Sequence, residues 1–268
     1  MLIENLLTAI TFHYDKNRLT YLEKVCRQIP SLAFNYKVIV VTNTQDENLL
    51  NEILDRLKGL NNLELVVRPQ ASHPYFLTWA HHPIFKQQLI SDSGFSHYMY
   101  LEDDIFVTPQ NINYWLRGRH ELQNSSFYPS FVRYEINQKN CKHYATDITK
   151  SLQFKKLPQV IISTDYAYIS SPQPYQGMYL MDQKMLREYY NSPAYSPDFG
   201  SWNIREKATQ GLTFLNVPNK FFSRNLIGCS LPQKSIDPDA FIEHLPANYA
   251  NDENSPFGKI LIDKLIKI

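Results

Sequence analysis

The sequence has 268 residues, of which 43% are hydrophobic and 13% aromatic, so it encodes a folded chain with a sizeable core rather than a disordered one. Lys and Arg number 27 against 26 for Asp and Glu, and this balance argues against nucleic acid as the principal partner. The 18 tyrosines suit a protein that binds sugars or nucleosides, although a large aromatic-rich core gives the same count.

The three cysteines, Cys26, Cys141 and Cys229, are far apart and odd in number, so they define neither a disulfide framework nor a zinc site. The N-terminus lacks a basic segment followed by an apolar run, and no apolar stretch has the length of a membrane span. We therefore expect a cytoplasmic protein without a transmembrane segment, for which peripheral membrane contact stays open.

The first 70 residues alternate between strand and helix patterns. Apolar runs predict strands, and apolar residues at helical spacing predict helices between them. The predicted strands are Leu6–Phe12, Tyr36–Asn43 and Leu63–Val67, and the predicted helices run from Asp15 to Pro30 and from Asp46 to Lys58. This β-α-β-α-β order predicts right-handed crossovers and a largely parallel sheet.

The central part continues with a helix from Leu77 to about Ile90, a buried strand from Tyr98, and a helix from Gln110 to Glu121. The pattern of apolar and polar residues changes between residues 127 and 168, where short alternating segments predict antiparallel strands. No GxGxxG follows the first strand and no GKT or GKS loop is present, which argues against a dinucleotide enzyme or a P-loop NTPase.

The last part of the sequence contains both strand patterns and helical spacing. The remaining predicted elements are a strand over Tyr175–Met181, a helix from Asp182 to Tyr190, a helix from Trp202 to Gly211, a strand over Phe214–Pro218 and an amphipathic helix from Pro256 to Ile268. The sequence therefore predicts an α/β fold, with a mixed central sheet flanked by helices and an antiparallel C-terminal half.

The strand from Tyr98 runs without a turn residue into Glu102, Asp103 and Asp104. Three carboxylates at the mouth of a buried strand repel one another and resist ionisation. A divalent metal would offset that cost, and oxygen ligands suit Mg²⁺ or Mn²⁺. The alternative is a solvated acidic turn that binds nothing. Because Ile105 resumes the apolar pattern directly after the acids, we favour the metal site.

This element order, with its strand that ends in Glu102-Asp103-Asp104, resembles the GT-A fold of nucleotide-sugar glycosyltransferases, a Rossmann-type sandwich. In that superfamily the acidic DxD motif holds Mn²⁺ or Mg²⁺ against the donor diphosphate, and here the motif has an EDD form. The resemblance implies that Asp104 is the most direct metal ligand. It also implies that Glu102 and Asp103 contact metal-bound water, ribose or the donor sugar.

The resemblance implies further site residues in the second half of the chain. An inverting transferase needs a carboxylate base for the acceptor hydroxyl, and Glu206 and Asp198 are the two candidates. The alternative for each is a helix ion pair or a turn cap. His244 resembles the C-terminal histidine that completes the metal shell in some families, and neutral imidazole is a suitable Mn²⁺ ligand. A packing or surface role for this histidine stays open.

Ligands of open α/β sheets bind at the carboxyl ends of the strands. Thr11, His13 and Tyr14 follow the first strand, Asn43 follows the second and Arg68 the third, so they are the candidate nucleotide contacts. Each of them taken alone also fits an ordinary loop contact.

The predicted protein is a single GT-A-like domain over residues 1–268, with a donor half (1–108), an acceptor half (109–250) and a terminal helix (251–268). It would move a sugar from a nucleoside-diphosphate donor to a glycan, lipid-linked or other hydroxyl acceptor, with inversion. The rivals are a metal-dependent phosphohydrolase or nucleotidyltransferase and a non-catalytic nucleotide- or sugar-binding protein. A two-metal hydrolase would need a second acidic or histidine cluster, which the sequence does not place near Asp104.

Overall fold

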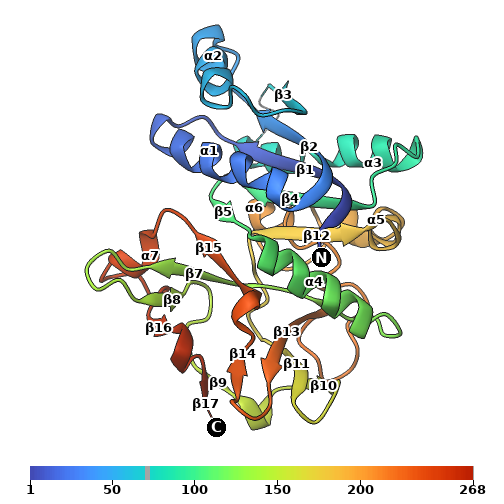
Figure 1. Cartoon of the computed structure of the whole chain (residues 1–268), viewed down its shortest axis with the longest axis vertical. Helices are drawn as coiled ribbons and strands as arrows, with labels where there is room; N and C mark the ends of the chain where they lie inside the picture. The colour runs from blue at the N-terminus through green and yellow to red at the C-terminus, as the bar shows by residue number, and fades with distance from the viewer. Residues whose placement is uncertain (70–72, 268) are drawn as a thin grey trace. The chain divides into compact units, whose positions relative to one another are not determined.

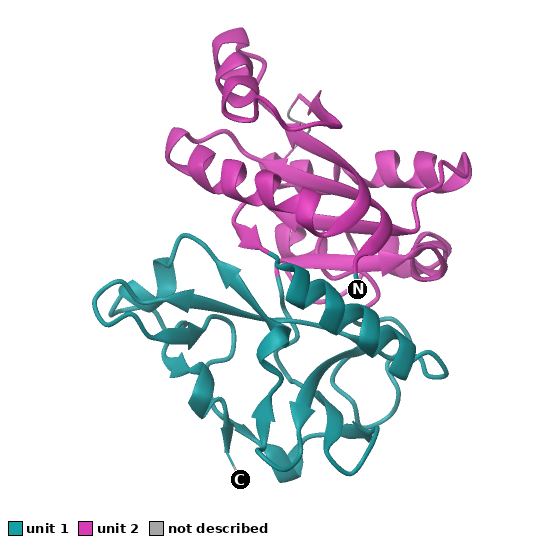
Figure 2. Ribbon diagram, in the orientation of Figure 1, with its two compact units in different colours: residues 1, 107–176, 213–268 teal, residues 2–106, 177–212 magenta. Residues whose placement is uncertain are grey.

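The computed structural model describes residues 1–69 and 73–267, which form two compact units (Figure 2). Unit 1 comprises residue 1 together with residues 107–176 and 213–268, and unit 2 comprises residues 2–106 and 177–212. The change of unit after residue 106 lies beside the predicted division near residue 108. Residues 177–212, however, return to the unit that contains the N-terminal strands.

Unit 2 contains the βα alternation expected from the sequence (Figure 1). Its elements are β1 (Ile3–Phe12), η1 (Lys16–Arg18), α1 (Leu19–Gln28), η2 (Ile29–Ser31), β2 (Ala33–Thr42), α2 (Glu47–Arg56), β3 (Leu63–Val67), η3 (Pro74–Trp79), α3 (His82–Ile90), β4 (His97–Glu102), β5 (Ile105–Phe106), β12 (Met178–Asp182), α5 (Gln183–Tyr190), η5 (Pro193–Tyr195) and α6 (Ile204–Lys207).

A five-stranded sheet in the order β12-β4-β1-β2-β3 forms the centre of unit 2. β1 pairs in parallel with β2 and β4, β2 pairs in parallel with β3, and β12 closes the β4 edge in antiparallel orientation. The side chains from Leu6 to Phe12 are all buried, as expected of a parallel strand that is covered on both faces. The predicted fold class, α/β with a mixed central sheet, is confirmed.

Local signals explain where the helices begin. The Asp15 carboxylate accepts a hydrogen bond from the Asn17 amide at 2.8 Å, which starts η1 directly before α1. The single helix predicted from Leu77 to Ile90 is divided into η3 and α3. Pro83 lies in the first turn of α3, where its missing N–H costs nothing, and it cannot continue the hydrogen bonding of a preceding helix.

Two adjacent histidines are buried in the aromatic core of unit 2. The His81 ring stacks on Tyr100 at 3.9 Å between centroids, and its two nitrogens lie 2.8 Å from the Thr78 carbonyl and 2.7 Å from the Tyr179 hydroxyl. Burial lowers the pKa of His81 from 6.5 to about 3. The pKa of the neighbouring His82 is also lowered by burial. Both imidazoles are therefore neutral parts of the core at pH 7.

We expect the free energy of unfolding to fall as the pH is lowered through 6.5 toward 3. The unfolded chain takes up a proton at His81 in this window while the folded chain does not, so acid favours unfolding. The loss at His81 alone is about 3 kcal/mol between pH 7 and pH 4. Urea unfolding at both pH values, compared between the native chain and His81→Gln, measures this contribution. His120→Gln, at an exposed histidine, is the control, and equal acid sensitivity in all three chains would contradict the assignment.

Unit 1 is built from shorter strands and one long helix (Figure 1). Its elements are α4 (Pro109–Glu121), β6 (Tyr128–Pro129), β7 (Val132–Ile136), β8 (His143–Ala145), β9 (Leu152–Gln153), η4 (Phe154–Lys156), β10 (Gln159–Ile161), β11 (Tyr166–Ser170), β13 (Asn225–Ser230), β14 (Ser235–Ile236), η6 (Pro238–Ala240), β15 (Phe241–His244), α7 (Asn248–Asn251), β16 (Ile260–Leu261), η7 (Ile262–Lys264) and β17 (Ile266–Lys267).

Most strand pairs of unit 1 are antiparallel, as predicted. This holds for β10 with β11, β11 with β13, β13 with β14, β7 with β8, and β8 with β16. Parallel pairs join β6 to β13, β7 to β15, and β9 to β17, which the short alternating segments did not indicate. No helix within residues 1–69 and 73–267 combines the length and apolar character that a membrane crossing requires.

Three further predicted elements differ from the structure. The helix expected over Trp202–Gly211 is reduced to α6, and residues 211–216 form turns instead of the expected strand over Phe214–Pro218. The helix expected from Pro256 is replaced by β16, η7 and β17, with Ile268 outside the described residues. Backbone pairing to β8 and β9 and burial of Leu265 override the helical spacing of these apolar residues.

Candidate functional site

The acidic motif lies at the carboxyl end of β4, the strand between β1 and the antiparallel edge strand β12. Glu102 ends the strand and pairs with Thr11 of β1, and Asp103 and Asp104 form the turn that follows. The exposed fractions of Glu102, Asp103 and Asp104 are 4%, 5% and 1%, so all three carboxylates are buried. The solvated acidic turn is therefore excluded as a description of this segment.

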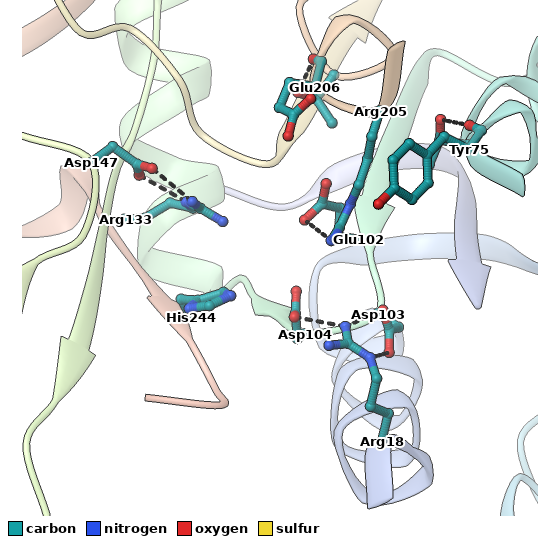
Figure 3. Close-up of polar contacts among 12 residues, drawn as sticks. Arg18, Tyr75, Glu102, Asp103, Asp104, Arg133, Asp147, Arg205, Glu206 and His244 are labelled. Carbon is teal, nitrogen blue, oxygen red and sulfur yellow. Dashed lines mark hydrogen bonds and ion pairs between the residues drawn. The ribbon is translucent and has the colours of Figure 1, made fainter. Parts of the chain in front are cut away.

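Arg18, the last residue of η1, holds the two aspartates. Its Nε donates to Asp103 Oδ2 at 2.8 Å, and its Nη2 donates to Asp103 Oδ1 at 2.6 Å and to Asp104 Oδ2 at 2.7 Å (Figure 3). The contact with Asp103 is bidentate, the geometry in which a guanidinium and a carboxylate bind most strongly. The cap at Asp15 and the start of α1 fix the backbone on either side of Arg18.

A second guanidinium comes from α6. Arg205 Nη2 donates to Glu102 Oε2 at 3.1 Å, and the Arg205 side chain is 40% exposed (Figure 3). The main chain of α6 is held in turn by Trp79, whose Nε1 donates to the Ile204 carbonyl at 2.9 Å. Every carboxylate of the motif thus contacts an arginine.

Burial and charge shift the pKa values of this cluster. Burial raises the pKa of Asp103, and the neighbouring carboxylates of Asp104 and Glu102 add to this, while hydrogen bonding to Arg18 opposes it. Burial also lowers the pKa of His13, and the cationic Arg205 and Arg18 lower it further. The His13 Nε2 atom is buried and has no hydrogen-bond partner among the described residues. His13 therefore belongs to the electrostatic surroundings of the acids as a neutral imidazole.

The other strand-end residues divide into two groups. Asn43 and Arg68 line one pocket of about 190 Å³ together with Phe76 and Leu77, and the Arg68 amide donates to the Thr42 carbonyl at 2.8 Å. Tyr14 has a different partner, because its hydroxyl donates to Glu52 Oε2 at 2.6 Å, which raises the pKa of Tyr14 to about 12. The structure thus brings Asn43 and Arg68 together, while the Tyr14 hydroxyl is hydrogen-bonded to a side chain of α2.

The two candidate bases have different surroundings, although both lie in unit 2. Glu206 follows Arg205 in α6, and its Oε2 atom is buried with no hydrogen-bond partner in the described part of the chain. Asp198 is exposed in the preceding loop, where its amide is bonded to Ser196 Oγ at 3.2 Å. Of the two, only Glu206 has a carboxylate oxygen that is withdrawn from water.

His244 ends β15 in unit 1. Its Nδ1 lies 2.6 Å from Glu135 Oε1, and the other oxygen of Glu135 accepts the amides of Tyr249 and Ala250 at 2.9 and 2.6 Å. A buried carboxylate bonded to Nδ1 fixes the ring orientation of a histidine and increases its basicity. The role of His244 as a metal ligand remains a prediction.

Arg18 and Arg205 were not found by reasoning from the sequence. Each arginine is separated by 85 to 103 residues from the acid it contacts, so no local spacing connects them. The available signal was the energetic one, because three buried carboxylates need cationic partners. The sequence predicts a metal for that purpose, and arginines from η1 and α6 also serve it.

No family model and no curated protein matches the chain. Among solved structures, 4-diphosphocytidyl-2C-methyl-D-erythritol synthase from Anaerococcus prevotii DSM 20548 aligns with 76% of this chain and 81% of its own, at 14% identity and a TM-score of 0.37. TarS from S. aureus aligns with 69% of this chain at 12% identity and a TM-score of 0.40, and its 1–349 fragment with 77% at 11% identity and a TM-score of 0.42.

The chain spans 29% of the TarS structure and 56% of the 1–349 fragment. With TM-scores below 0.5, these likenesses establish neither the family nor the activity of this chain.

Proposed function

We propose that the chain is a glycosyltransferase that moves a sugar from a nucleoside-diphosphate donor to an acceptor hydroxyl. The observation that carries the proposal is the buried motif Glu102-Asp103-Asp104 at the carboxyl end of β4, beside the end of β1. In open α/β sheets this edge is where ligands bind, and the ends of β2 and β3 add polar residues to it. The sheet order and the motif position support the GT-A resemblance.

The nucleotide is assigned to the ends of the parallel strands. Asn43 offers an amide donor and acceptor, Arg68 offers a guanidinium fork, and Phe76 offers an aromatic face in the same pocket. A pocket with apolar walls and a few convergent polar groups is the usual form of a small-molecule site. Thr11 and His13 extend this edge toward the acids, and Tyr14 would reach a nucleotide only by giving up its bond to Glu52.

The acids fit Mn²⁺ or Mg²⁺ by donor type, since all three are buried oxygen ligands. Among the described residues no group of three or more His, Cys, Asp or Glu side chains is arranged to hold a metal alone. Mg²⁺ keeps several of its waters and is usually bound through one or two carboxylates, to which substrate phosphates add when they are present, so Asp104 and Asp103 would hold the ion. When bound, it would supply positive charge where the departing diphosphate gains negative charge.

Glu206 is assigned as the base of an inverting transfer. The acceptor oxygen bonds to C1 of the sugar as the bond from C1 to the diphosphate oxygen breaks, and the acceptor proton passes to Glu206. A carboxylate in this role must present an oxygen that is free to accept a proton, which the buried Oε2 atom of Glu206 provides among the described residues. We assign recognition of the acceptor to residues 109–250. The acceptor is a glycan, a lipid-linked sugar or another hydroxyl compound.

The test uses purified full-length chain with a panel of UDP-, GDP-, CDP- and dTDP-sugars. We expect release of the free nucleoside diphosphate from one donor class, with water as the background acceptor, in the presence of Mn²⁺ and its loss with EDTA. Binding of a donor without any release would instead indicate a non-catalytic binding protein. Release of phosphate from simple phosphate esters would indicate a phosphohydrolase, and exchange of pyrophosphate into a nucleoside triphosphate would indicate a nucleotidyltransferase.

A further inference from the structure

Arg18 occupies three of the four carboxylate oxygens that Asp103 and Asp104 offer to a divalent cation. Its guanidinium contacts both oxygens of Asp103 and one oxygen of Asp104, at 2.6 to 2.8 Å. The exposed fractions of the two aspartate side chains are 7% and 2%, so neither carboxylate can turn to solvent for a second partner. The arginine and a metal ion therefore draw on one set of ligands.

The two cations exclude each other at this site on electrostatic grounds. A divalent ion bound to Asp103 and Asp104 would lie a few ångströms from the guanidinium, where like charges repel strongly in a buried environment. The guanidinium also takes up the lone pairs of Asp103 that face it in the bidentate contact. Metal binding to this pair therefore requires the Arg18 side chain to move away.

The position of Arg18 provides a route for that movement. It ends the three-residue η1, and its side chain is 26% exposed although the carboxylates it contacts are buried. The residues Asp15, Lys16 and Asn17 that precede it are exposed, so water can receive the displaced guanidinium. Arg205 has a different partner in the motif, because its Nη2 donates to Glu102 Oε2 at 3.1 Å.

We propose that Arg18 is a displaceable internal cation that competes with a divalent metal ion for Asp103 and Asp104. It offsets part of the negative charge of the buried aspartates while no metal is bound, and it leaves them when the metal binds. The inference rests on the proposed function only in taking these aspartates as the metal ligands. It adds that metal affinity is set by the strength of an arginine contact within the chain itself.

The test measures Mn²⁺ binding to the full chain without any nucleotide, by calorimetry or by the electron paramagnetic resonance of free Mn²⁺. We expect Arg18→Gln to lower the Kd for Mn²⁺ at least tenfold relative to the native chain. Arg27→Gln is the matched control, because Arg27 forms an exposed ion pair with Glu23 at 2.9 Å on the adjacent α1, and its Kd should stay unchanged. Adding Asp104→Asn to Arg18→Gln should remove the gain.

Three results would overturn the proposal: equal or weaker Mn²⁺ binding by Arg18→Gln, a gain that persists with Asp104→Asn, or no Mn²⁺ binding by either chain. Because Arg18→Gln leaves buried carboxylates unpaired and could impair folding, a second measurement uses the native chain. In ¹⁵N NMR the Nε–H of Arg18, bonded to Asp103, should exchange slowly with water without metal and rapidly at saturating Mg²⁺. An Nε–H that stays protected at saturating Mg²⁺ would also overturn it.

Neither measurement uses a sugar donor, so the outcome is independent of turnover. A chain that shows the competition and yet releases no nucleoside diphosphate from any sugar donor would overturn the proposed function alone. A chain that turns over a donor while Arg18→Gln leaves Mn²⁺ affinity unchanged would overturn this inference alone.

Discussion

Asp104→Asn should lower the rate of nucleoside-diphosphate release from the sugar donor by about 1,000-fold, the effect expected when a group that stabilises transition-state charge is lost. Asp104 is the most deeply buried acid of the motif, and the substitution keeps its shape while it removes the negative charge. The amide is a poor ligand for a divalent cation, so positive charge would no longer be held against the leaving diphosphate. Initial rates at saturating donor give the comparison.

The fold of this variant should survive, because asparagine fills the same space and its side-chain oxygen can still accept from Arg18. Far-ultraviolet circular dichroism and thermal unfolding check this point. Asp55→Asn, at an exposed acid of α2, serves as the matched control and should retain native turnover. Native turnover in Asp104→Asn itself would count decisively against the assignment of the acidic motif to catalysis.

Glu206→Gln should lower kcat by about 100-fold or more, the contribution expected of a general base, while it leaves the affinity for the donor nearly unchanged. Glutamine has the size of glutamate and cannot accept the proton of the acceptor hydroxyl. The loss should therefore fall on kcat and spare the KM for the donor. Steady-state kinetics with the donor varied at fixed acceptor concentration separates the two quantities.

Asp198→Asn is the natural comparison, because Asp198 is the other candidate base and lies exposed in the loop before α6. We expect its kcat to remain close to the native value. If Glu206→Gln weakened donor binding as much as turnover, Glu206 would have a structural role in α6. If Asp198→Asn showed the selective loss of kcat, the base would be Asp198 instead.

The sheet of unit 2 could be predicted because its strands are continuous apolar runs, as in Leu6–Phe12 and Tyr98–Leu101. Such runs are the direct signature of strands that are buried on both faces. The place of the acidic motif followed from the same run, since Glu102 is the residue at which the strand ends. The return of β12 to the edge of β4 could not be predicted, because strand pairing across a long connection leaves no local pattern.

The candidate site was only partly predictable for a related reason. A buried carboxylate at a strand end indicates a ligand site, because burial of its charge costs free energy. The sequence pattern does not specify which cation offsets that cost. Arg18 lies in the short η1, whose sequence indicates the start of a helix. Nothing in that sequence indicates that the Arg18 side chain contacts Asp103. The prediction of a C-terminal helix was wrong for the opposite reason. Their helical spacing was clear, and pairing with β8 and β9 outweighed it.

The antiparallel pairing of β12 with β4 bears on how the chain folds as it leaves the ribosome. The first four strands of the sheet are complete at Glu102, but the residue that covers the outer edge of Leu101 is Met178. During synthesis of the intervening segment, a hydrophobic strand edge stands open to other nascent chains. Aggregation of truncated translation products should therefore drop once the segment through Asp182 has emerged.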